Sequence, residues 1–320
     1  MTRHGWTADG YENVADAFAA NFTEQGELGA AFAAYRDGEL VVDLWGGRAD
    51  GDTGEPWRQD TIQLIFSGTK GLASACVLLL VERGLVDLDR PLAFYWPEFA
   101  AAGKGAITVA EVLSHQARLP GADFSQVDIL DHDAVASLLA AQVPAEDPRA
   151  GFMYHAITWG WLVDELVRRT DGRPLGLFFA EEFAQPLDLE VWIGLPSELH
   201  AKASTMVAAD GVLADAEETD PLRQLTRNPL LVPGAEKIWN SPGYRGAGLA
   251  AVGGFATARG MARFYASLLG EVDGVRVLKP ETVDRGRREL RRGIEPLWGS
   301  EMAYAAGFEL HTSAANLGAP

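Results

Sequence analysis

The sequence predicts a mixed α/β fold of the α+β type, in which an antiparallel sheet is flanked by helices. Two apolar runs, 29–35 and 40–45, are joined by Arg36-Asp37-Gly38-Glu39, and Asp-Gly between apolar runs is a strong hairpin signal. Residues 72–81 contain a single polar side chain, which predicts a helix that protein surrounds on most sides. A membrane-spanning helix needs roughly 20 such residues, so this helix belongs to a core.

The composition bounds the class of protein. The chain has 320 residues, 48% of them hydrophobic, which suffices for a large core in one or two domains. The formal net charge of −18 argues against nucleic acid and anionic membrane as partners. Cys76 is the one cysteine and the first ten residues lack an apolar signal segment, so a cytoplasmic location is predicted.

The remaining elements follow from apolar spacing and capping signals. A first amphipathic helix is predicted at 9–25, and a short strand at 61–66. Thr108 and Glu111 form the capping-box pattern at the start of another helix. Loops and short helices are expected between 204 and 242, and a strand-like segment at 304–310. Further helices are predicted at 108–115, 133–141, 157–169, 175–183 and 257–269.

Five arginines lie close together near the C-terminal end of the sequence. They are Arg285, Arg287, Arg288, Arg291 and Arg292. Their density within eight residues is interpreted as the solvated face of one helix.

Ser67 and Lys70 stand directly before the long apolar run. Residues three apart are neighbours on a helix surface, so this spacing brings an amine to a hydroxyl. A serine becomes a useful nucleophile when a neighbouring base takes its proton, and burial lowers a lysine pKa enough for that role. The alternative is an N-cap serine followed by a solvated lysine. A solvated lysine would be oddly placed just ahead of a buried run, which favours catalysis.

Four motifs resemble the serine β-lactamase superfamily, and within it the family VIII carboxylesterase branch. They are Phe66-Ser-Gly-Thr-Lys-Gly71, Leu113-Ser-His-Gln-Ala-Arg-Leu-Pro-Gly121, Tyr154-His-Ala-Ile-Thr-Trp-Gly-Trp-Leu162 and Phe183-Ala-Gln-Pro-Leu-Asp-Leu189. The resemblance implies one β-lactamase-like catalytic unit over 1–320. An α/β part is expected from 1–85 plus 245–320, with an all-helical insertion at 86–244 and the active site between them.

Carried onto this sequence, the resemblance implies Ser67 as the acyl-accepting nucleophile, Lys70 as its partner and Tyr154 as a general acid or base. The Ser67 backbone N–H would be one oxyanion donor. A tyrosine held in the core by a satisfied hydroxyl is the alternative for Tyr154. His115 and His155 are expected to be structural. No cofactor is implied, and the six histidines show no metal-binding pairing.

The sequence departs from the family pattern in two places. The second motif is commonly Tyr-x-Asn in β-lactamases, whereas position 156 is Ala, which favours simple esters over β-lactams. A third motif ending in glycine is not found, because His311-Thr312-Ser313 lacks that glycine. The chain is therefore expected to be truncated at its C-terminus, with an unpaired sheet edge and possible self-association.

The predicted function is a serine hydrolase that acts through an acyl-enzyme on small carboxylic esters. One alternative is amide hydrolysis, by a β-lactamase or a peptidase-like enzyme specific for D-amino acids. Another is a truncated, catalytically impaired member that only binds acyl compounds. The expected partner is a small-molecule ester or amide, with no nucleic acid and no membrane. The sequence does not specify the physiological substrate, the acyl-chain length or the oligomeric state.

Overall fold

The computed structural model describes residues 3–209 and 218–314. It begins with an antiparallel sheet in the order β1-β3-β2, made of β1 (Arg3–Thr7), β2 (Gly29–Arg36) and β3 (Glu39–Gly47). The hairpin predicted around Asp37-Gly38 is confirmed, and both turn residues have positive φ. Strand β1 was not predicted, because Arg3 to Thr7 carries neither an apolar run nor a clear alternation.

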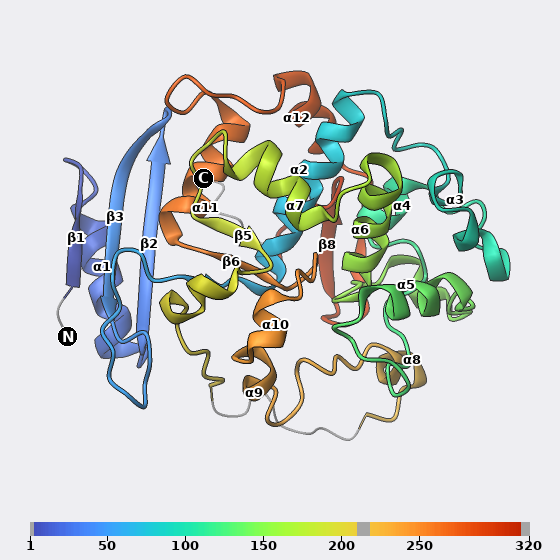
Figure 1. The fold of residues 1–320 in the computed structure, drawn as a ribbon, viewed down its shortest axis with the longest axis horizontal. Coiled ribbons are helices and arrows are strands. Elements are labelled where there is room, and N and C mark those ends of the chain that lie inside the picture. The colour runs from blue at the N-terminus through green and yellow to red at the C-terminus, as the bar shows by residue number, and fades with distance from the viewer. Residues whose placement is uncertain (1–2, 210–217, 315–320) are drawn as a thin grey trace.

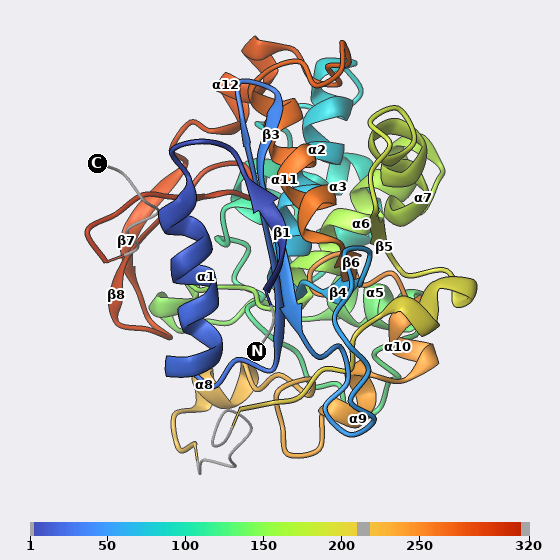
Figure 2. The ribbon, with the colours of Figure 1, turned by 90° about the vertical axis from the view of Figure 1, so that its left-hand side faces the viewer.

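Two helices cover the opposite faces of this sheet (Figure 2). Helix α1 (Glu12–Glu24) lies on one face and buries Ala15 and Phe18 against Val42 and Leu44 of β3. Helix α11 (Ala258–Leu269) packs on β2. The sheet is therefore joined to the rest of the protein through α11, while α1 closes a small core of its own.

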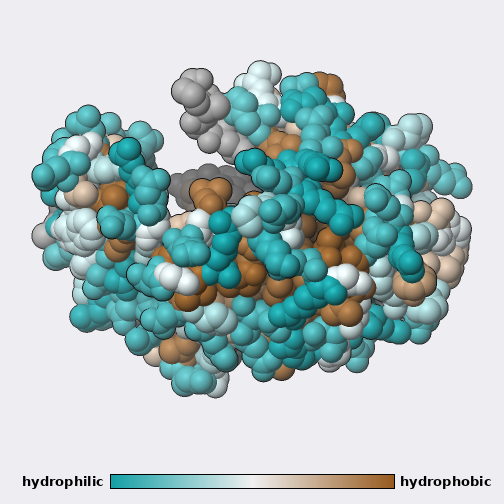
Figure 3. All heavy atoms as spheres, turned by 90° about the horizontal axis from the view of Figure 1, so that it is seen from above, coloured by the Kyte–Doolittle hydropathy of each residue, from teal (hydrophilic) through white to brown (hydrophobic). Residues whose placement is uncertain are grey.

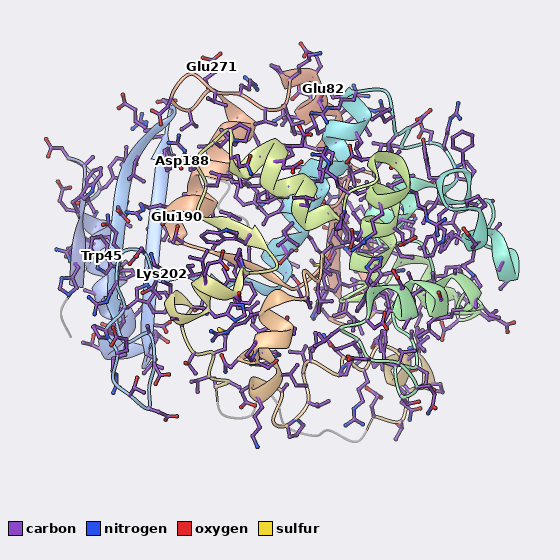
Figure 4. The ribbon with its side chains drawn as sticks, in the orientation of Figure 1. Trp45, Glu82, Asp188, Glu190, Lys202 and Glu271 are labelled. Carbon is purple, nitrogen blue, oxygen red and sulfur yellow. The ribbon has the colours of Figure 1, made fainter. Side chains whose placement is uncertain are left out.

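Helix α2 (Thr69–Glu82) lies at the centre of the main core (Figure 1). Every residue from Thr69 to Val81 is buried, as the apolar run predicted. The helices α6 (Thr158–Asp171), α7 (Leu175–Phe179) and α12 (Pro280–Gly286) pack against it. Its C-terminal Glu82 accepts hydrogen bonds from Lys279 N at 2.8 Å and Thr282 Oγ1 at 2.6 Å, which fixes the start of α12 (Figure 4).

A second small sheet joins segments that are far apart in the sequence. Its order is β4-β6-β5, with β4 (Gln63–Leu64), β6 (Gly254–Ala256) and β5 (Val191–Ile193). Strand β5 lies within the segment 86–244, so the expectation that this segment is all-helical is corrected by one strand. The pairing of β4 with β6 places the turn before α2 against the chain that precedes α11.

The third sheet has the order β7-β8-β9 and corrects the interpretation of the arginine cluster. Its strands are β7 (Arg291–Glu295), β8 (Ser300–Tyr304) and β9 (Glu309–Leu310). Helix α12 ends at Gly286, so Arg291 and Arg292 lie on a strand and the five arginines share no helix face. Charge density predicted an exposed segment but not its backbone conformation.

The other helices are short and mostly match the predicted positions. The capping box of Thr108 and Glu111 is present at the start of α4. Segment 175–183 continues beyond α7 as one π-helical turn, η4 (Ala180–Ala184). The remaining α-helices are α3 (Leu92–Tyr95), α4 (Val109–Leu113), α5 (His132–Ala141), α8 (Pro221–Leu225), α9 (Glu236–Trp239) and α10 (Pro242–Gly246). The 3-10 segments are η1 (Phe66–Gly68), η2 (Pro97–Gly103), η3 (Pro148–Phe152) and η5 (Ser197–Lys202).

Seen from above, the molecule is hollowed between the hairpin sheet and the remaining elements (Figure 3). Within the described ranges, no helix combines the length and the hydrophobicity needed to cross a bilayer.

The packing of α6 generates a first prediction. A methyl group at Gly160 would lie 2.6 Å from Ala251 N and 2.9 Å from Ala251 Cβ, so Gly160→Ala should lower the free energy of unfolding by about 1–3 kcal/mol. Gly246→Ala is the matched control, because nothing lies within 4 Å of its added methyl. Urea denaturation measures both variants. Equal stabilities would show that α6 does not need this close approach.

Candidate active site

Ser67 lies in the turn between β4 and α2, and its side chain is exposed. The residue before it, Phe66, has a φ of 42°, a sparsely populated backbone conformation that clusters at functional sites. Thr69 holds this turn: its Oγ1 donates to Phe66 O at 2.5 Å and accepts from Gly254 N at 2.8 Å. The position of Ser67 is thereby tied to β6, and its side chain remains exposed.

Lys70 lies one turn along the same helix face and is only 5% exposed. Its Nζ is 3.3 Å from Ser67 Oγ, 2.8 Å from Ala156 O and 3.2 Å from Ala251 O. Among the described residues, no carboxylate forms an ion pair with it. Burial therefore acts without compensation and lowers the pKa of Lys70 from 10.5 to about 7.

Three oxygens surround Nζ, those of the Ala156 carbonyl, the Ala251 carbonyl and the Ser67 hydroxyl. An ammonium fills this arrangement with three N–H donors. A neutral amine fills it with two N–H donors to the carbonyls and a lone pair toward Ser67 Oγ. The lowered pKa makes the neutral form accessible near pH 7, and in that form Lys70 can accept the serine proton.

Tyr154 lies between η3 and α6 and reaches the same hydroxyl. Its phenol hydrogen-bonds Ser67, and burial, the larger influence, raises the pKa of Tyr154 above its ordinary value. Lys70 Nζ is 4.9 Å from the centroid of its ring. A phenol that keeps its proton at neutral pH can donate it, so the chemistry of this position suits a general acid.

His115 and His155 are buried, and both rings hydrogen-bond or pack against protein groups; their structural role stays a prediction. His155 Nε2 accepts from Leu119 N at 3.1 Å, and its Nδ1 lies 2.6 Å from Met153 O. His115 Nδ1 accepts from His155 N at 3.2 Å, and the His115 ring packs 4.6 Å from the Tyr154 ring. Burial lowers the pKa of His155 to about 4 and that of His115 well below its usual range, so both support Tyr154 as neutral rings.

Two features of this site were not found from the sequence. Glu295 is fully buried, and its Oε1 accepts from Tyr154 N at 2.8 Å. Ala251 supplies a carbonyl to Lys70 from the glycine-rich segment 246–254. Glycine density signals close backbone approach, but a contact made by a backbone carbonyl has no side-chain signature. Thr312, from the motif considered for the third position, donates to Glu301 O at 2.8 Å.

Nearly the whole chain matches one protein family. Residues 14–317 match the Beta-lactamase family model. The chain belongs to the beta-lactamase family. Its mixed architecture and the relation to serine hydrolases predicted from the four motifs are confirmed.

Relatives of this beta-lactamase-family chain include esterases. Esterase/beta-lactamase LipL of Mycobacterium tuberculosis is 37% identical over 292 residues, covering 87% of this chain and 68% of the relative. A penicillin-binding protein homolog from Caulobacter crescentus superimposes with a TM-score of 0.88 at 34% identity, over 97% of this chain and 83% of that one. A family VIII carboxylesterase gives a TM-score of 0.85 at 33% identity, over 98% and 84%. The C-terminal truncation expected for this chain stays a prediction.

The lowered pKa of Lys70 predicts the pH dependence of acylation. The rate of Ser67 acylation should rise with pH and level off above about pH 7, since only neutral Lys70 accepts the serine proton. Above about pH 7, Lys70→Arg should lower the rate by about 10²- to 10⁴-fold, because an arginine stays protonated; below about pH 7 the loss should shrink, because the wild-type lysine also becomes protonated. Single-turnover kinetics between about pH 5 and 9 measure both. A wild-type rate that does not change with pH would contradict the assignment.

The lowered pKa of Lys70 can also be measured through the pH dependence of protein stability, without an activity assay. Lys70 has a lower pKa in the folded protein than in the unfolded chain, so the unfolded state binds more protons between about pH 7 and 10.5. The free energy of unfolding of the wild type, relative to Lys70→Met, should therefore rise with pH across this window. The slope is at most about 1.4 kcal/mol per pH unit. A constant difference would show that Lys70 titrates normally.

Proposed function

We propose that this chain hydrolyses small carboxylic esters through an acyl-enzyme on Ser67. The observation that carries the proposal is an exposed serine hydroxyl in contact with both a buried lysine of lowered pKa and a phenol of raised pKa. Lys70 takes the proton as Ser67 Oγ attacks the ester carbonyl. Tyr154 gives a proton to the leaving alcohol oxygen. Water then releases the acid by the reverse proton transfers.

The start of α2 supports the developing oxyanion. The first N–H groups of a helix lack acceptors within the helix, and the helix dipole favours negative charge at that end. The Ser67 N–H lies in η1, the 3-10 turn that leads directly into α2. One well-placed donor of this kind is worth about 10²- to 10³-fold in turnover.

Simple esters are favoured over β-lactams by the residue at position 156. Its backbone carbonyl accepts from Lys70 Nζ, and its side chain is a methyl group. A Tyr-x-Asn motif would place an amide there to hold an acylamino group, and the methyl group of Ala156 cannot donate such a hydrogen bond. Hydrolysis of β-lactams or related amides is the second candidate, supported by the family itself.

Leaving-group dependence tests the division of roles. Tyr154→Phe should lower kcat/KM for an alkyl acetate by about 10²- to 10⁴-fold, because the alkoxide needs a proton to leave. The same variant should change kcat/KM for p-nitrophenyl acetate much less, since nitrophenolate leaves without one. Equal losses on both esters would indicate a different role for the phenol.

The Ser67→Ala variant tests whether Ser67 is the nucleophile. It should abolish covalent labelling by a fluorophosphonate, measured by mass spectrometry. Labelling that persists, or that maps to Ser74 or Ser114, would contradict the nucleophile. Turnover of a chromogenic cephalosporin that exceeds ester turnover would favour the second candidate.

We also propose self-association through the edge strand β2, which pairs only with β3 among the described strands. An unpaired edge exposes backbone donors and acceptors to another chain. The wild type should elute from size exclusion as a concentration-dependent oligomer. Phe32→Lys, at an exposed position of β2, should shift it toward monomer because an edge lysine blocks strand addition.

Phe94→Lys is the matched control, since Phe94 is exposed on α3. A wild type that elutes as a monomer at every concentration would overturn the proposal.

We also propose that the enzyme lies in the cytoplasm, which the single buried cysteine supports.

A further inference from the structure

The turn between β7 and β8 carries a large aromatic side chain beside the candidate active site. Trp298 is 53% exposed, and its ring centroid lies 5.1 Å from the ring of Tyr154 at an angle of 50°. Single exposed apolar residues are common on protein surfaces. The position of this one, against the residue that hydrogen-bonds the nucleophile, sets it apart.

A single carboxylate fixes Trp298 relative to Tyr154. Glu295 is 0% exposed, and its Oε2 accepts from Leu297 N at 2.7 Å and from Trp298 N at 3.1 Å. Its Oε1 accepts from Tyr154 N. Hydrogen bonds to a charged acceptor are strong and compensate its burial. The backbones of Tyr154 and Trp298 are therefore held by the two oxygens of one side chain.

Three other contacts make the turn rigid. The guanidinium of Arg223 donates to Pro296 O at 3.1 Å, and Leu297 packs against a cluster formed by Ala150, Met153 and Leu222. Gly299 adopts a φ of 67° and its N–H donates to Glu295 O at 2.8 Å. The backbone and the preceding leucine are thus fixed to the protein, while the Trp298 ring remains half exposed.

We propose that Trp298 is a specificity-determining residue, which binds the alcohol group of the ester and favours aromatic or broad apolar alcohols. The proposal rests on the proposed ester hydrolysis and on Tyr154 as the proton donor. Because Tyr154 protonates the leaving oxygen, the group attached to that oxygen lies nearest to it. The exposed ring of Trp298 packs beside the Tyr154 ring and offers an apolar surface whose backbone is fixed before substrate arrives.

A pair of acetate esters tests this inference, because the acyl group is constant and neither alcohol leaves easily. For benzyl acetate, Trp298→Ala should lower kcat/KM by about 3- to 10-fold, mostly through KM, the range expected for losing an aromatic contact. For methyl acetate the change should stay within about twofold. Trp298→Phe should keep most of the preference for benzyl acetate.

Trp6→Ala is the matched control, since Trp6 is 46% exposed on β1 of the hairpin sheet. It should change neither ester. Thermal unfolding checks that each variant is folded. Equal losses on methyl and benzyl acetate in Trp298→Ala would show that the ring only supports Tyr154, and would overturn the proposal. Fluorophosphonate labelling of Ser67 distinguishes failure of the Trp298 proposal from failure of the proposed function. If the wild type is labelled but does not prefer benzyl acetate, only the role of Trp298 is contradicted. If the wild type is not labelled, the proposed function itself is contradicted.

Discussion

The burial of the Lys70 amine without a counter-charge is the constraint on which the site depends. A charged ammonium in a protein interior is unfavourable unless it is paired. Here α2 is surrounded by protein along its whole length, and the amine meets two backbone carbonyls instead of a carboxylate. An ordinary lysine is almost fully charged near pH 7, whereas Lys70 is there partly an uncharged amine, the state that can accept a proton from Ser67.

This constraint explains why distant segments must be placed accurately. Ala156 precedes α6, and Ala251 lies before β6, so the two carbonyls reach Lys70 from different parts of the chain. The close approach of α6 to Ala251 is possible because residue 160 is glycine. The pairing of β4 with β6 then fixes the turn that carries Ser67. Packing between elements thus sets the pKa of one side chain.

The sequence predicted the parts of the site that depend on local order, and missed those that depend on assembly. The spacing of Ser67 and Lys70, followed by an apolar run, was enough to predict a serine beside a buried lysine. Tyr154 required the resemblance to a family, because an isolated tyrosine has no local signature. Glu295 was not predicted, since its role is to bind backbone N–H groups that meet it only in the folded protein. The arginine cluster was assigned to a helix because charge density carries no backbone periodicity.

Burial acts in opposite directions on the acid and the base of this site. It lowers the pKa of Lys70 and raises that of Tyr154, because in each case it disfavours the charged form. Near pH 7 Tyr154 therefore keeps its proton, and a substantial fraction of Lys70 is the neutral amine. In the proposed reaction the amine becomes charged as the oxyanion forms, so the two charges would appear together and stabilise each other in a medium of low dielectric. The apolar surroundings of α2 therefore serve stability in the resting protein and strengthen the charge pair in the transition state.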